Sequence, residues 1–182
     1  MNGFLASLHA ERVSRQPLRV STHAITPGVQ VKVVEQHGSH LGSSLWHSAL
    51  AFSAYICRRH ELWVAPRRCL ELGAGCGTVG IVAACSSVGH TVVLTDKPEV
   101  CEHMEVNKAA NAAAIQAAGA QVCVRPLSWL MPQEDAAAVE TAQSQGDAEW
   151  AAVLLAAGLQ NPVVNEGSAS QRPAFDIVLA SE

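Results

Sequence analysis

The chain has 182 residues with 12 basic and 16 acidic side chains, which give a formal net charge of -4 at pH 7. This length is typical of one domain, and the lack of excess positive charge excludes nucleic acid as the main partner. No run approaches the roughly 18 apolar residues of a membrane-spanning helix, and the six cysteines form no CxxC pair, so we expect no membrane partner and no metal.

The N-terminal part of the sequence predicts a β-hairpin followed by a helix. Val29, Val31 and Val33 alternate with other residues in the period of a strand, which we place in an N-terminal hairpin. After a break rich in glycine and serine, Ser44 is a candidate N-cap. From Leu45 onward, apolar residues fall at helical spacing, which predicts a packing helix.

From Arg68 onward, short apolar runs alternate with helical stretches. This alternation is typical of βαβ units around a parallel sheet. We therefore expect an α/β fold with a Rossmann-like, doubly wound and mostly parallel sheet, in which Gly119 ends a helix. The expected strands are residues 68–72, 91–95, 121–124 and 175–180, and the expected helices are residues 78–87 and 99–118.

Residues 132–172 differ in composition from their surroundings. They are rich in Ala, Gln, Ser and Asn, carry acidic residues against the single base Arg172, and lack strand signals. We interpret them as an Ala-rich insertion within a domain spanning residues 29–182. Residues 1–28 are interpreted as an N-terminal extension, which we expect to be flexible.

A glycine-rich run at the end of the first parallel strand is the main candidate for ligand binding. Gly73, Ala74, Gly75 and Gly77 form a turn in which the backbone bends sharply and approaches a ligand, where a Cβ would intrude. The run also fits the GxGxxG of dinucleotide-binding proteins. Glu71 favours a different ligand, because a carboxylate repels pyrophosphate but attracts the ammonium and sulfonium charges of S-adenosylmethionine. A structural partner for Glu71 is the alternative.

Asp96 follows the next strand, 19 residues after Gly77. An acid near this spacing accepts hydrogen bonds from both hydroxyls of a ribose, which nucleotides and S-adenosylmethionine share. Asp96 therefore supports an adenosine-containing ligand without choosing between the two. The alternative is a helix cap ahead of Pro98.

These segments together resemble the seven-strand, class I protein-lysine methyltransferases that use S-adenosylmethionine, and in particular the methyltransferase family 16 group. Members of that group modify chaperones, elongation factors and the valosin-containing ATPase. The resemblance covers residues 29–129 and 175–182. It rests on residues 45–49, 70–81, 94–96, Asn107 with Asn111, 126–129 and 175–182.

The resemblance implies further site residues and an incomplete sheet. Trp46, Trp129 and Ala180 would line the cofactor pocket beside the glycines and Asp96; for either tryptophan, core packing is the alternative. Glu182 aligns with an acid of the family that lies close to the substrate, which makes it the candidate catalytic residue. The family's strand order is 3-2-1-4-5-7-6, so we expect strands 1 to 4 only, with an exposed edge and low stability.

We therefore expect a protein N-methyltransferase that uses S-adenosylmethionine and acts on lysine side chains of a cellular protein, with the activity of the truncated chain in doubt. A non-catalytic module that binds the cofactor and an NAD-dependent oxidoreductase are the alternatives. We expect the complete protein to be monomeric and cytoplasmic, with the nucleus or an organelle as other locations.

Overall fold

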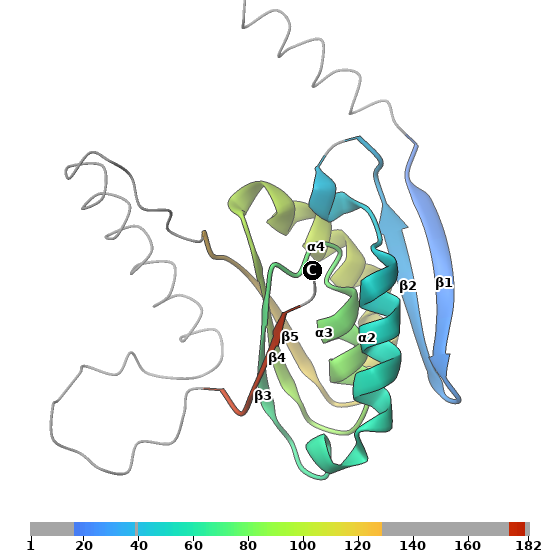
Figure 1. Cartoon of the computed structure of the whole chain (residues 1–182), viewed down its shortest axis with the longest axis vertical. Helices are drawn as coiled ribbons and strands as arrows, with labels where there is room; N and C mark the ends of the chain where they lie inside the picture. The colour runs from blue at the N-terminus through green and yellow to red at the C-terminus, as the bar shows by residue number, and fades with distance from the viewer. Residues whose placement is uncertain (1–16, 39, 129–174, 181–182) are drawn as a thin grey trace, which may run out of the picture.

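The computed structural model describes residues 17–38, 40–128 and 175–180 (Figure 1). These residues form a two-stranded antiparallel hairpin, a four-stranded parallel sheet and helices between them. The elements are β1 (Arg19–Thr26), β2 (Val29–Glu35), η1 (Leu41–Ser43), α2 (His47–Arg58), η2 (His60–Leu62), β3 (Arg68–Leu72), α3 (Thr78–Cys85), β4 (Thr91–Asp96), α4 (Pro98–Ala110), α5 (Ala112–Ala117), β5 (Gln121–Pro126) and β6 (Ile177–Ala180).

The parallel sheet has the strand order β5-β4-β3-β6. This is the 3-2-1-4 part of the expected order, so the predicted α/β class, the parallel sheet and the N-terminal hairpin are confirmed. In the register, Leu70 of β3 lies opposite Val93 of β4 and Val178 of β6. The described helices lie on one face of the sheet, and the hairpin lies beyond them on the same side (Figure 1).

The core forms where the sheet meets these helices. On β3 and β4, Cys69, Val92 and Leu94 face the helices and are completely buried. Val33 of the hairpin and Ile56 of α2 join the same cluster. Burying such side chains contributes about 1.5–3 kcal/mol each, so the helix-facing side of the sheet supplies much of the stability that positions the strand ends.

Two asparagines on α4 hold the hairpin in place. The Asn107 side chain accepts the N–H of Val34 at 2.8 Å and donates to its carbonyl at 3.1 Å. Asn111 does the same at Lys32, with distances of 2.9 and 2.8 Å. The amides thus satisfy the free edge of β2 as another strand would. The sequence analysis cited both asparagines only for the resemblance and missed this role.

Two predicted helix boundaries are wrong. The first helix begins at His47, with Trp46 at the N-cap position, and not after Ser44. The backbone is extended at Ser44 (φ -114°, ψ 142°) and at Trp46 (φ -87°, ψ 137°), so the helix cannot begin before His47; the buried Glu35 carboxylate accepts the N–H of Leu45 within this extended segment at 2.8 Å. The helix expected over residues 99–118 is divided at Asn111 into α4 and α5.

The hairpin reaches into the segment assigned to the N-terminal extension, since β1 lies between residues 1 and 28. The insertion at residues 132–172 lies outside the described residues. Within the described ranges, no helix is both long and apolar enough to span a bilayer, and no group of three or more metal-binding side chains is present. The six cysteines, all within the described residues, form no disulfide.

Candidate functional site

The glycine-rich loop follows β3 at the carboxyl edge of the sheet, the edge at which the parallel strands end. Gly73, Gly75 and Gly77 have φ values of 61°, 54° and 71°, which lie in a region of backbone conformation that residues other than glycine rarely adopt. The loop is fastened to the neighbouring strand because Ala74 N–H donates to the carbonyl of Thr95 at 2.9 Å. The backbone geometry of this turn thus explains why the sequence has glycines there.

A second backbone segment packs directly on this loop. A Cβ at Gly75 would lie 3.3 Å from the carbonyl oxygen of Gly42 in η1. A Cβ at Gly42 would lie 2.8 Å from the Val100 side chain on α4. The Cys76 thiol also donates to the Gly42 carbonyl, at 3.5 Å. Segment 41–46 therefore fixes one wall of the site, and its Gly42 was not singled out from the sequence.

Gly80 lets α3 approach the sheet closely. Its N–H donates to Oε2 of Glu71 at 2.7 Å. A Cβ at Gly80 would lie 2.3 Å from the Leu94 side chain and 2.5 Å from that carboxyl oxygen. The last glycine of the motif therefore serves helix-to-strand packing, as it does in dinucleotide-binding folds.

The Glu71 side chain is completely buried beneath α3. Its burial raises its pKa to about 8; the Gly80 N–H opposes this shift and the charge of Asp96 adds to it. Burial therefore favours the protonated carboxyl, which weakens the argument that took Glu71 as a negative charge. Among the described residues its Oε1 has no hydrogen-bond partner. Contact between Glu71 and a ligand stays a prediction.

Asp96 connects the ends of two strands. Its Oδ2 accepts the N–H of Gly75 at 2.8 Å, and its Oδ1 accepts the N–H of Lys97 at 2.7 Å. The side chain is not the cap of α4, because Lys97 occupies the N-cap position. An ionised carboxylate has about four acceptor sites, so both oxygens retain capacity for a ligand's hydroxyls.

The other predicted residues fall in three places. Trp46 is 54% exposed at the start of α2, and its Nε1 donates to the carbonyl of Leu41 at 3.2 Å, so core packing does not explain it. Ala180 is the last residue of β6 and lies opposite Leu72, the residue that comes immediately before the glycine-rich loop. Trp129 and Glu182 lie outside the described residues, and their roles stay predictions.

The structure thus brings the glycine-rich loop, Asp96 and Ala180 to one edge of the sheet (Figure 1). Trp46 is joined to them through η1, because Leu41 accepts its indole N–H and Gly42 touches the loop. In open α/β sheets, ligands bind outside the carboxyl ends of the strands. The arrangement offers a closely approachable backbone, an acid with free acceptor capacity and an exposed aromatic ring.

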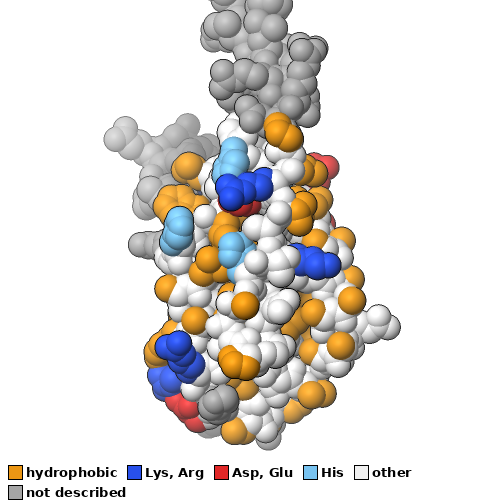
Figure 2. Space-filling view, turned by 90° about the vertical axis from the view of Figure 1, so that its right-hand side faces the viewer, with side chains coloured by type: hydrophobic (Ala, Val, Ile, Leu, Met, Phe, Trp, Pro, Cys, Tyr) orange, Lys and Arg blue, Asp and Glu red, His pale blue; other side chains and the backbone are white. Residues whose placement is uncertain are grey.

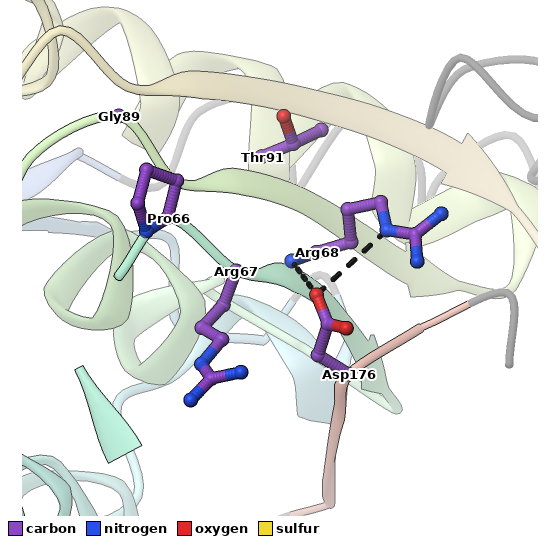
Figure 3. A pocket seen from close by; sticks show the side chains of 6 residues that line it. All are labelled: Pro66, Arg67, Arg68, Gly89, Thr91 and Asp176. Atoms are coloured by element: carbon purple, nitrogen blue, oxygen red, sulfur yellow. Dashed lines mark hydrogen bonds and ion pairs between the residues drawn. The ribbon is translucent and has the colours of Figure 1, made fainter. Parts of the chain in front are cut away.

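The opposite, amino edge carries a cavity of about 480 Å³, which Figure 3 shows from close by. There Asp176 accepts the N–H of Arg68 at 2.8 Å and pairs with its guanidinium Nε at 3.7 Å. The Asp176 N–H also donates to the Arg68 carbonyl at 2.8 Å. These contacts extend the pairing of β3 with β6, so we assign this cavity a structural role. Its lining residues are Pro66, Arg67, Arg68, Gly89, Thr91 and Asp176.

Comparison with known proteins gives a consistent result. A family model described as lysine methyltransferase matches residues 25–144. Protein-lysine N-methyltransferase rrg1 of Schizosaccharomyces pombe is 34% identical over 140 residues, which are 72% of this chain and 46% of that protein. EEF1A lysine methyltransferase 3 of Xenopus tropicalis is 32% identical over 115 residues, 62% of this chain and 48% of that protein.

Methyltransferase-like protein 22 of Mus musculus is 37% identical over 93 residues, which are 50% of this chain and 22% of that protein. The chain therefore spans less than half the length of each of these three relatives. The family match includes the whole carboxyl edge formed by β3 and β4, with the glycine-rich loop and Asp96.

Proposed function

The chain belongs to the lysine methyltransferase family, and from that premise we propose that it binds S-adenosylmethionine at the carboxyl edge of its sheet and methylates a lysine side chain of another protein. The observation that carries the proposal is the Asp96 carboxylate. It ties the glycine-rich loop to the end of β4 and keeps acceptor capacity for a ribose.

The residues at this edge fit such a donor. At Gly75 a Cβ would crowd the Gly42 carbonyl, so a bare backbone is needed there for segment 41–46 to pack beside the loop. Asp96 is suited to the two ribose hydroxyls, and the exposed ring of Trp46 offers a flat surface for an apolar or cationic group. S-adenosylmethionine, when bound, supplies an electrophilic methyl group on a sulfonium centre.

Methyl transfer to lysine forms a nitrogen–carbon bond, breaks the carbon–sulfur bond and releases one proton from the amine. The nucleophile must be neutral, although an ordinary lysine has a pKa of about 10.4 and is neutral in only about one molecule in 2500 at pH 7. Holding it deprotonated and in line therefore addresses roughly 4.6 kcal/mol. We propose that Glu182, aligned with the family's acid, orients this amine.

The identity of the acceptor is a separate part of the proposal. Two relatives, from Xenopus tropicalis and Mus musculus, are named as EEF1A lysine methyltransferases, which makes EEF1A the first substrate to test. The net charge of -4 supports a protein rather than a nucleic acid as the partner. We also propose that the complete protein is a cytoplasmic monomer.

A non-catalytic module that binds the cofactor is the alternative predicted from the sequence, and the matches to methyltransferases do not favour it. The family match favours the methyl donor over NAD as the ligand.

A methyl-transfer assay separates these possibilities. The chain is incubated with S-adenosylmethionine labelled in its methyl group and with EEF1A or a heat-treated cell extract, and labelled residues are identified by mass spectrometry. We expect label on lysine, and none with Asp96→Ala. Donor binding without label on any protein would support the non-catalytic module, and binding of NAD in place of the donor would contradict the proposal.

A further inference from the structure

A second pocket lies between the hairpin and the start of α2. It has a volume of about 260 Å³ and is lined by Arg19 and His23 of β1, Glu35 of β2, His37 after β2, and His47 of α2, among others. Figure 2 shows this face, where histidine side chains gather near basic and acidic ones. None of these five residues was singled out as a site residue from the sequence.

The strand pairing explains how these side chains meet. Arg19 lies opposite Glu35 in the register of β1 and β2, and His23 follows on the same face of β1 because side chains alternate along a strand. His23 Nε2 lies 2.8 Å from the Ser21 hydroxyl, and His37 Nδ1 lies 3.2 Å from the Ser44 hydroxyl. Each imidazole is thus oriented through one nitrogen and keeps the other for a ligand.

The side chains that line the pocket offer several N–H donors to an anion. One arginine and three histidines face a single acid, and Oε1 of that acid, Glu35, already accepts the Leu45 N–H. None of the ion pairs within the described ranges involves Arg19. The first turn of α2, which begins at His47, has no acidic residue, so no carboxylate there opposes an incoming anion.

The pocket shares a wall with the proposed donor site. Leu45 and His47 line the pocket, and Trp46 between them is the aromatic residue assigned to the donor. A few residues earlier, Gly42 touches Gly75 of the glycine-rich loop. A group held in the pocket would therefore lie next to the segment that carries Trp46.

We propose that this pocket binds the carboxylate of an aspartate or glutamate of the protein substrate, close in that protein to the methylated lysine. The inference rests on the proposed function and adds a substrate preference to it. The volume of about 260 Å³ is below the roughly 300–1,000 Å³ of small-molecule sites, and it suits one side chain. Arg19 binds the carboxylate, and the three histidines supply further N–H donors.

The test follows the histidine ring signals of the whole chain by NMR, with S-adenosylhomocysteine present. Two capped peptides serve as probes, Gly-Lys-Gly-Glu-Gly and the same peptide with glutamine in place of glutamate. We expect the glutamate peptide alone to shift the ring signals of His23, His37 and His47. Equal shifts with both peptides, or no shifts with either, would overturn the proposal.

Paired arginine variants show whether the pocket itself is responsible. Arg19→Gln should weaken binding of the glutamate peptide about fivefold, which corresponds to about 1 kcal/mol. Arg58→Gln is the matched control, because Arg58 is an exposed arginine at the far end of α2. Equal weakening by both variants would contradict a specific role for Arg19.

Two further measurements separate this proposal from its premise. Calorimetry with S-adenosylhomocysteine reports donor binding on its own, and Arg19→Gln should leave it unchanged because Arg19 is not part of the donor site. Donor binding without a response to the glutamate peptide would overturn the proposal about the pocket and leave the proposed function standing. Absence of donor binding would overturn the proposed function. Histidine shifts with inorganic phosphate but not with the glutamate peptide would reassign the pocket to phosphoryl groups.

Discussion

Asp96 and Asp176 lie at opposite edges of one parallel sheet, and each accepts a backbone N–H at 2.8 Å. Asp176 also faces the Arg68 guanidinium, so its charge is compensated within the fold. The hydrogen bonds that Asp96 accepts come from the backbone N–H groups of Gly75 and Lys97. The contacts of Asp176 hold a strand in place, whereas those of Asp96 leave its carboxylate able to bind a ligand.

The largest difference between the edges should appear in donor affinity. Asp96→Ala removes the support of the glycine-rich loop and the proposed ribose contacts, and hydrogen bonds to charged groups contribute about 1.5–3 kcal/mol each. We expect S-adenosylhomocysteine to bind about 100-fold more weakly. Asp176→Ala is the matched control at the other edge, and a similar loss there would remove the distinction between the two aspartates.

A methyl group added at Gly80 tests how closely the carboxyl edge is packed. Gly80→Ala would drive a Cβ into Leu94 and the Glu71 carboxyl, and overpacking of this kind costs about 1–3 kcal/mol. Gly28→Ala is the control, because Gly28 has a φ of 87° but nothing within 4 Å of a Cβ. Urea unfolding should show the larger loss for Gly80→Ala, and a larger loss for Gly28→Ala would contradict close packing of α3.

The buried Glu71 should make stability depend on pH. Its pKa is raised from 4.5 to about 8 on folding, so the folded state binds more protons and stability falls as pH rises through this window, by up to about 1.4 kcal/mol per unit. Burial lowers the pKa of His90 and His103 from 6.5. The unfolded state therefore binds more protons at these two residues, and the free energy of unfolding falls as the pH falls through that value.

The slope between pH 7.5 and 8, where an ordinary histidine is mostly neutral, therefore reports mainly on Glu71. Glu71→Gln, which resembles the protonated carboxyl, should flatten this part of a urea stability profile. An unchanged slope in this variant would show that Glu71 is ionised in the folded protein at neutral pH.

The smallest effect is expected for the amino edge. Asp176→Ala removes the ion pair with Arg68 and the hydrogen bond to its N–H, and should lower the free energy of unfolding by about 1 kcal/mol. Glu102→Ala, on the exposed surface of α4, is the control with no expected change. Equal unfolding midpoints for both variants would mean that the Asp176 contacts do not hold β6.

Much of this fold could be predicted from the sequence because its signals are local. Apolar runs gave the parallel strands, and the glycines of the loop marked a turn that their positive φ values require. The helix start at His47 was not predicted, since Ser44 and Trp46 have extended backbone angles in a segment that contacts Glu35, ten residues before Leu45. The division at Asn111, where φ is -109° and ψ is 9°, falls at a residue that also contacts Lys32, 79 positions away in the chain.

The candidate site could be predicted only in part, because some of its contacts join residues far apart in the sequence. Asp96 was found from its spacing to the glycines, but the packing of Gly42 on Gly75 brings together residues far apart in sequence. The raised pKa of Glu71 was not predicted, because the burial that causes it is not visible in a strand-end motif. The pocket at Arg19 required the pairing of β1 with β2.

Isothermal titration calorimetry of the unmodified chain tests the central claim most directly. The chain is titrated with S-adenosylhomocysteine and, in a separate experiment, with NAD at the same concentration. We expect one molecule of S-adenosylhomocysteine to bind per chain and NAD to give no saturable heat. Saturable binding of NAD without binding of S-adenosylhomocysteine would contradict the assignment of the carboxyl edge to a methyl donor.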